Sequence, residues 1–188
     1  MADVHCGLAT SRFAAAGANI LLMADYNQSL DVPEAIRRIR SLAEFDLHWI
    51  EEPVKAEDLA GQAAVRAGTG VAVQTGENWW FPDGMAAALA AGASDHAMPD
   101  VMKIGGVIGW MQAPALAAVR NIPVSSHIFV EASAHLLAVT PTPHMIEYLD
   151  KAGAIVAKPI ALMDDTITAQ GPGLGIDIDE SALARYRT

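Results

Sequence analysis

Three stretches of the sequence decide the fold: Ile20-Leu-Leu-Met-Ala-Asp25, Leu47-His-Trp-Ile-Glu51 and Val71-Ala-Val-Gln-Thr-Gly-Glu77. Each stretch is a short apolar run that ends at an acidic residue, and the acids lie 26 residues apart (51 − 25 and 77 − 51). A β-strand with its returning α-helix takes about that many residues. The spacing therefore predicts successive βα units of a parallel sheet.

The acidic residues Asp25, Glu51 and Glu77 lie at the C-terminal ends of neighbouring predicted strands. Three carboxylates at one edge of a parallel sheet would repel one another unless a positive charge lay between them. Oxygen ligands suit a hard divalent cation, and Mg2+ is the first candidate. Each acid taken alone has another interpretation, as a helix cap or as the partner of a Lys or Arg. Their matched positions on three consecutive strands favour a metal site.

The strand and helix signals continue along the chain. We expect strands at about 19–25, 47–51, 71–75, 96–98, 122–127 and 144–149. We expect helices from about residue 33, then at about 56–67, 82–91, 109–120 and 131–139. A complete (β/α)8 barrel has eight strands and usually about 250 residues. Residues 19–158 are thus predicted to form about six βα units of an incomplete α/β barrel of the TIM type.

The two ends of the chain differ from this pattern. Residues 1–18 form an atypical N-terminal segment with an Ala-rich stretch near Arg12 that favours a helix. Residues 159–188 form a tail in which two apolar pairs flank Asp164-Asp165, a pattern typical of a hairpin. An extended loop is predicted at Gly171-Pro-Gly-Leu-Gly175.

Composition excludes several classes of protein. The net charge of −10 argues against a nucleic-acid partner, because phosphate binding needs clustered Lys and Arg. No apolar run reaches the ~18 residues that span a bilayer, so no membrane partner is expected. The first residues lack the pattern of a signal peptide. The single cysteine, Cys6, has no internal disulfide partner, and the expected location is the reducing cytoplasm.

A candidate base lies at the ends of two later strands. His127 follows Ser125-Ser126, and Asp100 ends the preceding strand. The acid can accept a hydrogen bond from one imidazole nitrogen and leave the other nitrogen to take a proton. The alternative is that His127 is a structural residue in a short apolar segment.

Three further residues are candidates for binding a substrate. Glu147 ends the last strand and could donate a hydrogen bond or a proton to a substrate oxygen, or it could be an ordinary capping or paired acid. Asn27, two residues after Asp25, could bond a substrate hydroxyl. Lys103 follows Asp100 closely and could bind the substrate or offset local negative charge.

The motifs around these residues resemble the mandelate racemase branch of the enolase superfamily, the family of mandelate racemase and muconate lactonizing enzyme. The resemblance covers about residues 19–150 and lies in the segments Asp25-Tyr-Asn27-Gln-Ser-Leu, Trp49-Ile-Glu51-Glu52-Pro53, Gly76-Glu77-Asn78-Trp79, Met98-Pro-Asp100-Val-Met-Lys103-Ile-Gly-Gly, Ser125-Ser126-His127 and Ser133-Ala-His135-Leu-Leu-Ala-Val-Thr-Pro-Thr-Pro-His144.

This resemblance implies a (β/α)8 barrel with Mg2+ on Asp25, Glu51 and Glu77. It implies a base dyad of His127 and Asp100, with Glu147 as the electrophile at the substrate carboxylate. In such enzymes the base removes the proton α to the carboxylate of a 2-hydroxy acid, and the metal stabilises the resulting enediolate. The expected activity is a racemase, with an acid-sugar dehydratase or an inactive truncated fragment as alternatives.

Two parts of the family pattern have no match in this sequence. The family has an α+β capping domain before the barrel and a Lys-x-Lys motif on the second barrel strand, and nothing before Asp25 resembles either. Residues 159–188 would pack on that cap. We therefore expect a C-terminal portion of a racemase-like protein, with racemisation impaired. Open sheet edges expose apolar faces, which predicts a homo-oligomer.

Overall fold

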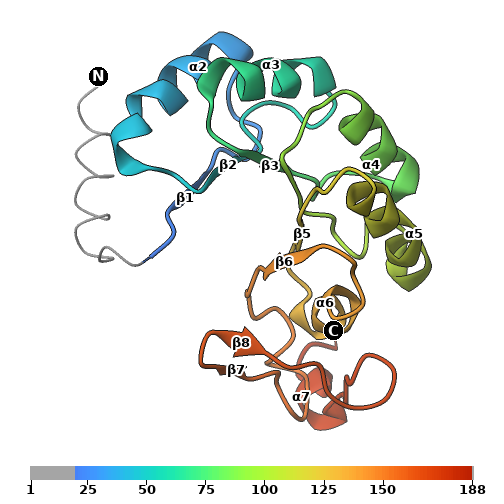
Figure 1. The fold of residues 1–188 in the computed structure, drawn as a ribbon. Helices are drawn as coiled ribbons and strands as arrows, with labels where there is room; N and C mark the ends of the chain where they lie inside the picture. The colour runs from blue at the N-terminus through green and yellow to red at the C-terminus, as the bar shows by residue number, and fades with distance from the viewer. Residues whose placement is uncertain (1–19, 188) are drawn as a thin grey trace. The chain divides into compact units, whose positions relative to one another are not determined.

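The computed structural model describes residues 20–187 (Figure 1). The Ala-rich stretch near Arg12 and the cysteine Cys6 lie outside the described residues. The chain divides into two compact units. Among the described residues, the first unit comprises 20–75 together with Ala87–His96, and the second comprises Gly76–Ala86 together with 97–187.

The first unit contains two and a half βα units in chain order. Its strands are β1 (Met23–Asp25), β2 (Trp49–Glu51) and β3 (Val73–Thr75), and its helical segments are α2 (Val32–Ser41), η1 (Ala43–Phe45) and α3 (Leu59–Thr69). The strands pair in parallel, with Asp25 beside Glu51 and Glu51 beside Gln74. The predicted parallel βα pattern is confirmed in this unit.

The helices of the first unit begin and end where the sequence signals them. Asp31 caps α2, because its carboxylate accepts a hydrogen bond of 2.9 Å from the backbone N–H of Glu34. Pro33 lies in the first turn, where its missing N–H costs nothing. Helix α3 ends at Gly70, whose φ of 71° belongs to the left-handed region that favours glycine.

A small apolar core holds this unit together. Helices α2 and α3 lie side by side (Figure 1) and pack against each other. The fully buried side chains of Ile39, Ile50 and Val65 come from α2, β2 and α3 respectively, so one cluster joins both helices to the sheet. Because each strand has only three residues, this cluster is the main source of stability in the unit.

We predict that Ile39→Ala destabilises the protein by about 2–5 kcal/mol, because it opens a cavity where the structure cannot fully collapse. Chemical denaturation gives the change in the free energy of unfolding. The matched control is Ile108→Ala, at a side chain that is 76% exposed, and its effect should stay within about 0.5 kcal/mol. Equal effects of the two substitutions would contradict this packing.

Helix α2 also carries a charged cluster that titrates at an unusual pH. Hydrogen bonds from Arg37 (2.7 Å) and Arg38 (2.6 Å) lower the pKa of Glu34 from 4.5 to about 2. Since the pKa in the folded state is the lower one, the stabilisation is present above the ordinary pKa of Glu34. It is lost as the pH falls through about 2.

We expect carboxyl NMR of Glu34 to show a titration midpoint near pH 2 in the folded protein. Replacing both arginines, in Arg37→Gln/Arg38→Gln, should return the midpoint toward the ordinary value because both hydrogen bonds are lost. The exposed Glu57 serves as the reference carboxyl in the same spectra. A midpoint for Glu34 near its ordinary pKa in the unsubstituted protein would refute the arrangement.

The second unit continues the alternation of strand and helix. Its elements are α4 (Phe81–Ala90) and β4 (His96–Ala97), which both cross the boundary between the units, followed by α5 (Gly106–Ala118), β5 (Val124–Ser126), α6 (Val130–Leu137) and β6 (Pro143–Ile146). Strand β5 pairs in parallel with both β4 and β6. The strands therefore place their C-terminal ends, and the residues that follow them, on the same side of the sheet.

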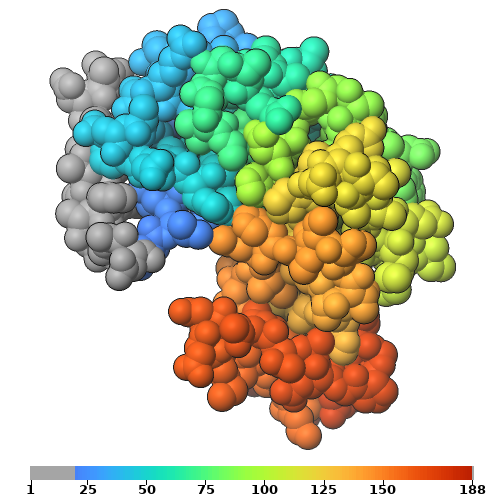
Figure 2. All heavy atoms as spheres, viewed as in Figure 1, coloured from blue at the N-terminus to red at the C-terminus, as the bar shows by residue number. Residues whose placement is uncertain are grey.

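The tail contains the predicted hairpin. Strands β7 (Leu162–Met163) and β8 (Thr166–Ile167) pair antiparallel around Asp164 and Asp165, which both have positive φ as a tight two-residue turn requires. Helix α7 (Glu180–Ala184), capped by Asp179, was not expected from the sequence. In Figure 2 the atoms of this tail, coloured from orange to red, form a closely packed group.

Two further expectations concern membrane-spanning helices and the domain boundaries. No helix in the described part of the chain is long and apolar enough to span a bilayer. The domain boundaries predicted after residues 18 and 158 stay predictions.

Candidate active site

The centre of the candidate site is a short hydrogen bond in the second unit. His127 directly follows β5, and Asp100 follows β4 by three residues, so the parallel strands bring the two side by side. The Nδ1 atom of His127 lies 2.6 Å from Oδ2 of Asp100. The structure thus brings together the two residues that the sequence predicted as a dyad.

Asp100 is held rigidly by its own loop. Its other carboxylate oxygen, Oδ1, accepts backbone N–H bonds from Met102 (2.7 Å) and Lys103 (3.2 Å). The residue is only 2% exposed, and this burial alone would raise the pKa of Asp100. The hydrogen bonds from His127 and the two backbone groups outweigh burial and lower the pKa of Asp100. The acid therefore stays ionised and points at the imidazole.

The second ring nitrogen of His127 faces two more carboxylates. Its Nε2 lies 3.4 Å from Oε2 of Glu77 and 3.9 Å from Oε2 of Glu147. Burial lowers the pKa of His127, but the hydrogen bond to Asp100 and the charges of Glu77 and Glu147 raise it further than burial lowers it. The net effect is a raised pKa of His127, which suits a ring that takes up a proton and later releases it.

Glu147 is the exposed member of this group. It follows β6 directly, and its side chain is 43% exposed. Its Oε2 accepts a hydrogen bond of 3.0 Å from the backbone N–H of Ile128, the residue after His127. The carboxyl is thereby fixed next to the imidazole while its outer side stays open to a ligand.

Glu77 is linked to Lys103 through a carboxamide. Asn78 donates from Nδ2 to Oε1 of Glu77 (3.1 Å) and accepts at Oδ1 from Nζ of Lys103 (2.7 Å). The second unit therefore brings together five of the predicted site residues: Glu77, Asp100, Lys103, His127 and Glu147.

The remaining predicted residues lie in the first unit. Asp25 and Glu51 are register partners at the ends of β1 and β2. Asn27 adopts a left-handed conformation with φ of 44°, and its backbone N–H donates to Oδ1 of Asp25 (2.7 Å). This turn fixes the Asp25 carboxylate and leaves the Asn27 side chain exposed.

Glu51 is oriented by two neutral donors. Its Oε2 accepts hydrogen bonds from Nε1 of Trp49 (3.3 Å) and Nε2 of Gln74 (3.2 Å). Gln74 is fully buried and lies opposite Glu51 in the parallel ladder. These two hydrogen bonds fix the direction of the Glu51 carboxylate.

Sequence reasoning missed the roles of Gln74 and Asn78. The signal for Gln74 is a polar amide inside an otherwise apolar strand, in register with the end of the strand before it. The signal for Asn78 is weaker, because the residue only follows Glu77 in the sequence. Its partner Lys103 is 25 positions away, and only the fold shows that the two meet.

The donor chemistry fits a hard divalent cation. The candidate ligands are all carboxylates, and Asp25 and Glu51 come from adjacent strand ends in register. Among residues 20–187, no three His, Cys, Asp or Glu side chains gather closely enough by themselves to enclose an ion.

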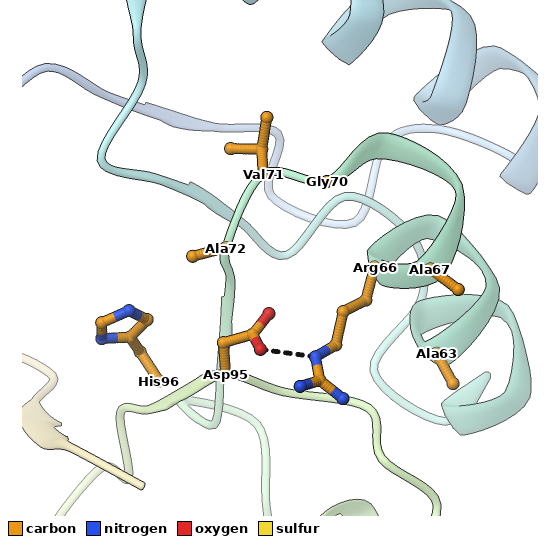
Figure 3. Close-up of a pocket in the computed structure, with 8 residues that line it drawn as sticks. All are labelled: Ala63, Arg66, Ala67, Gly70, Val71, Ala72, Asp95 and His96. Atoms are coloured by element: carbon orange, nitrogen blue, oxygen red, sulfur yellow. Dashed lines mark hydrogen bonds and ion pairs between the residues drawn. The ribbon is translucent and has the colours of Figure 1, made fainter.

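A separate cavity of about 570 Å³ in the first unit lies at the opposite ends of its strands (Figure 3). It is lined by Ala72, just before β3, and by Asp95 and His96, at the start of β4. The guanidinium group of Arg66, which also lines the cavity, donates to Asp95 (2.6 Å) and to the carbonyl oxygen of Gly92 (3.2 Å). This arrangement joins α3 to the strand segment rather than presenting a charge to a ligand.

Comparison with known proteins identifies the family of this chain. A family model described as "Enolase C-terminal domain-like" matches residues 9–182. The chain belongs to this family. The resemblance of its motifs to the enolase superfamily is confirmed, and so is the fold class, since six parallel strands with intervening helices form part of a (β/α)8 barrel.

The curated relatives include a cycloisomerase and a dehydratase. A 3,6-anhydro-alpha-L-galactonate cycloisomerase from Streptomyces coelicolor is 36% identical over 90% of this chain and 47% of its own length. An L-talarate/galactarate dehydratase from Salmonella typhimurium is 30% identical over 89% of this chain and 42% of its own length. The chain thus spans about half the length of the curated relatives it matches.

A solved structure is also similar to this chain. An enolase from Bradyrhizobium, complexed with magnesium and mandelic acid, is 55% identical in sequence with a TM-score of 0.93. The match covers 95% of this chain and 50% of the Bradyrhizobium chain. Magnesium is therefore bound by a protein of closely similar fold.

We predict that the neutral ring of His127 carries its proton on Nδ1, because the Asp100 carboxylate can only accept a hydrogen bond. ¹⁵N NMR above the pKa of the ring should show Nδ1 protonated and Nε2 unprotonated. Asp100→Asn should populate the other tautomer as well, because an amide can donate to Nδ1. Asp165→Asn, in the exposed hairpin turn, is the control. Identical spectra for Asp100→Asn and the unsubstituted protein would contradict the assigned roles.

Proposed function

We propose that the intact protein removes the proton α to the carboxylate of a 2-hydroxy acid, with Mg2+ as its cofactor. The observation that carries this proposal is the imidazole of His127, bound to Asp100 at 2.6 Å and facing Glu77 and Glu147 with its other nitrogen. An imidazole held in this way acts as a general base near neutral pH.

His127 is the base in this proposal, and Asp100 sets its tautomer and stabilises the imidazolium that forms. Burial of Asp100 keeps water away from the hydrogen bond between them. The proton from the α-carbon goes to Nε2, the nitrogen that does not face Asp100. The Asp100 carboxylate, hydrogen-bonded to Nδ1, then stabilises the charged ring.

Asp25, Glu51 and Glu77 are the proposed metal ligands. A Mg2+ ion on these oxygens supplies positive charge against the negative charge that develops on the substrate carboxylate. Support comes from the register of Asp25 with Glu51, from the neutral donors that aim Glu51, and from the magnesium in the Bradyrhizobium structure.

Glu147 is proposed to meet the substrate carboxylate from the other side. Its carboxyl is fixed by Ile128 and open outward, so that in its protonated form it can donate a hydrogen bond to a substrate oxygen. Asn27 is proposed to contact a substrate hydroxyl, because its side chain is exposed beside Asp25.

Two reactions share this first step. Return of a proton to the α-carbon gives racemisation of a 2-hydroxy acid, and the mandelic acid in the Bradyrhizobium complex is an acid of this kind. Loss of a β-hydroxyl with a proton gives dehydration of an acid sugar, the reaction named for the Salmonella relative. Racemisation is the first candidate, and dehydration needs only the one base that His127 supplies.

We expect the intact protein with Mg2+ to exchange the α-proton of its substrate in D2O, as measured by proton NMR. A panel of mandelate and C6 acid sugars covers both reactions, since a keto acid product reports dehydration. His127→Asn should lower the exchange rate at least 10³-fold, because it removes the base and leaves a polar side chain of similar size in its place.

The matched control is His135→Asn, at a half-buried histidine on α6 that takes no part in the dyad. It should leave the exchange rate unchanged within about twofold. If His127→Asn exchanged the proton as fast as the unsubstituted protein, the assignment of the base would be wrong. The homo-oligomer and the cytoplasmic location stay predictions.

A further inference from the structure

A closed ring of contacts surrounds the candidate base and includes a residue with no assigned role. Asp100 fixes the backbone of Lys103, Lys103 bonds Asn78, Asn78 bonds Glu77, and Glu77 faces His127. His127 then returns to Asp100. Every member lies in the second unit.

The chemistry of Lys103 decides which way Asn78 points. An ammonium group only donates hydrogen bonds, so the atom 2.7 Å from Nζ of Lys103 must be the carbonyl oxygen Oδ1 of Asn78. The amide nitrogen Nδ2 is then turned toward Oε1 of Glu77, at 3.1 Å. The amide cannot flip without losing both bonds.

This orientation gives the two oxygens of the Glu77 carboxylate different contacts. Its Oε1 is held by Asn78, and its Oε2 faces His127 at 3.4 Å. The backbone N–H of Phe81 also donates to the carbonyl oxygen of Lys103 (3.1 Å), so the loops that carry Asn78 and Lys103 are joined twice. A carboxylate held from one side keeps a fixed direction for its other oxygen.

We propose that Asn78, locked by Lys103, is a positioning residue that sets the orientation of Glu77 for binding the divalent cation. This inference rests on the proposed function, because it assigns Glu77 as a metal ligand. It replaces direct substrate binding as the role of Lys103. Partners that orient a metal ligand typically contribute about 10–100-fold to metal affinity.

The test combines Mg2+ calorimetry with a readout that needs no metal. Asn78→Leu and Lys103→Met are close in shape to the original side chains and carry no polar group at the site. In the intact protein, each should weaken Mg2+ binding by about tenfold or more. The double variant should bind Mg2+ no more weakly than the weaker-binding single variant, because both substitutions break the same chain of contacts. Lys151→Met, at an exposed lysine, is the control.

The metal-free readout is the side-chain amide of Asn78 in ¹⁵N NMR spectra. Both Lys103→Met and Glu77→Leu should shift its Nδ2 signals, since the first removes the donor at Oδ1 of Asn78 and the second removes the acceptor of Nδ2. Unchanged signals in both variants would overturn the proposal, whether or not metal binds.

The two arms separate this inference from the proposed function. If the unsubstituted protein binds no Mg2+, the proposed function fails, and the NMR signals still decide the orientation of Asn78. If Glu77→Gln abolishes binding while Asn78→Leu and Lys103→Met leave it unchanged, the proposed function stands and this inference is wrong. A raised KM for the carboxylate with unaltered Mg2+ affinity in Lys103→Met would also overturn it, because Lys103 would then contact the substrate directly.

Discussion

The hydrogen bond between Asp100 and His127 is the interaction on which the rest of the site depends. At 2.6 Å it joins the loops after β4 and β5, and its geometry leaves Nε2 as the only basic atom of the ring. Burying the Asp100 carboxylate, which is 2% exposed, would cost free energy if it had no hydrogen-bond donors. Two backbone N–H groups of its own loop donate to it. The fold therefore stabilises the charge of Asp100 that the proposed reaction uses.

Crowding of carboxylates is the second constraint. Glu77, Asp100 and Glu147 all lie within 4 Å of the His127 ring atoms, while Asp25 and Glu51 end neighbouring strands of the first unit. Like charges placed together need positive charge or donated hydrogen bonds. The protein supplies Gln74 to Glu51, Asn78 to Glu77 and the backbone of Ile128 to Glu147. These neutral donors orient the acids, and the proposed cation would supply the positive charge.

The sequence predicts the elements of this fold well for a definite physical reason. Strand ends are marked by the change from apolar residues to Asp, Glu or His, and Asp31 and Pro33 mark the start of α2. Parallel strands fix which residues become neighbours, so the pairing of Asp100 with His127 follows from the order of the strands. Helix α7 was missed because its five residues carry too little periodicity to stand out. The contact of Lys103 with Asn78 was missed because it depends on how two loops pack, which no local pattern records.

The most direct test of the account is a crystal structure of the intact protein with Mg2+ and a 2-hydroxycarboxylate inhibitor. The account predicts one ion about 2.1 Å from an oxygen of each of Asp25, Glu51 and Glu77. It also predicts that the α-carbon of the inhibitor faces Nε2 of His127. An ion bound elsewhere, or an inhibitor whose α-carbon points away from that nitrogen, would contradict it.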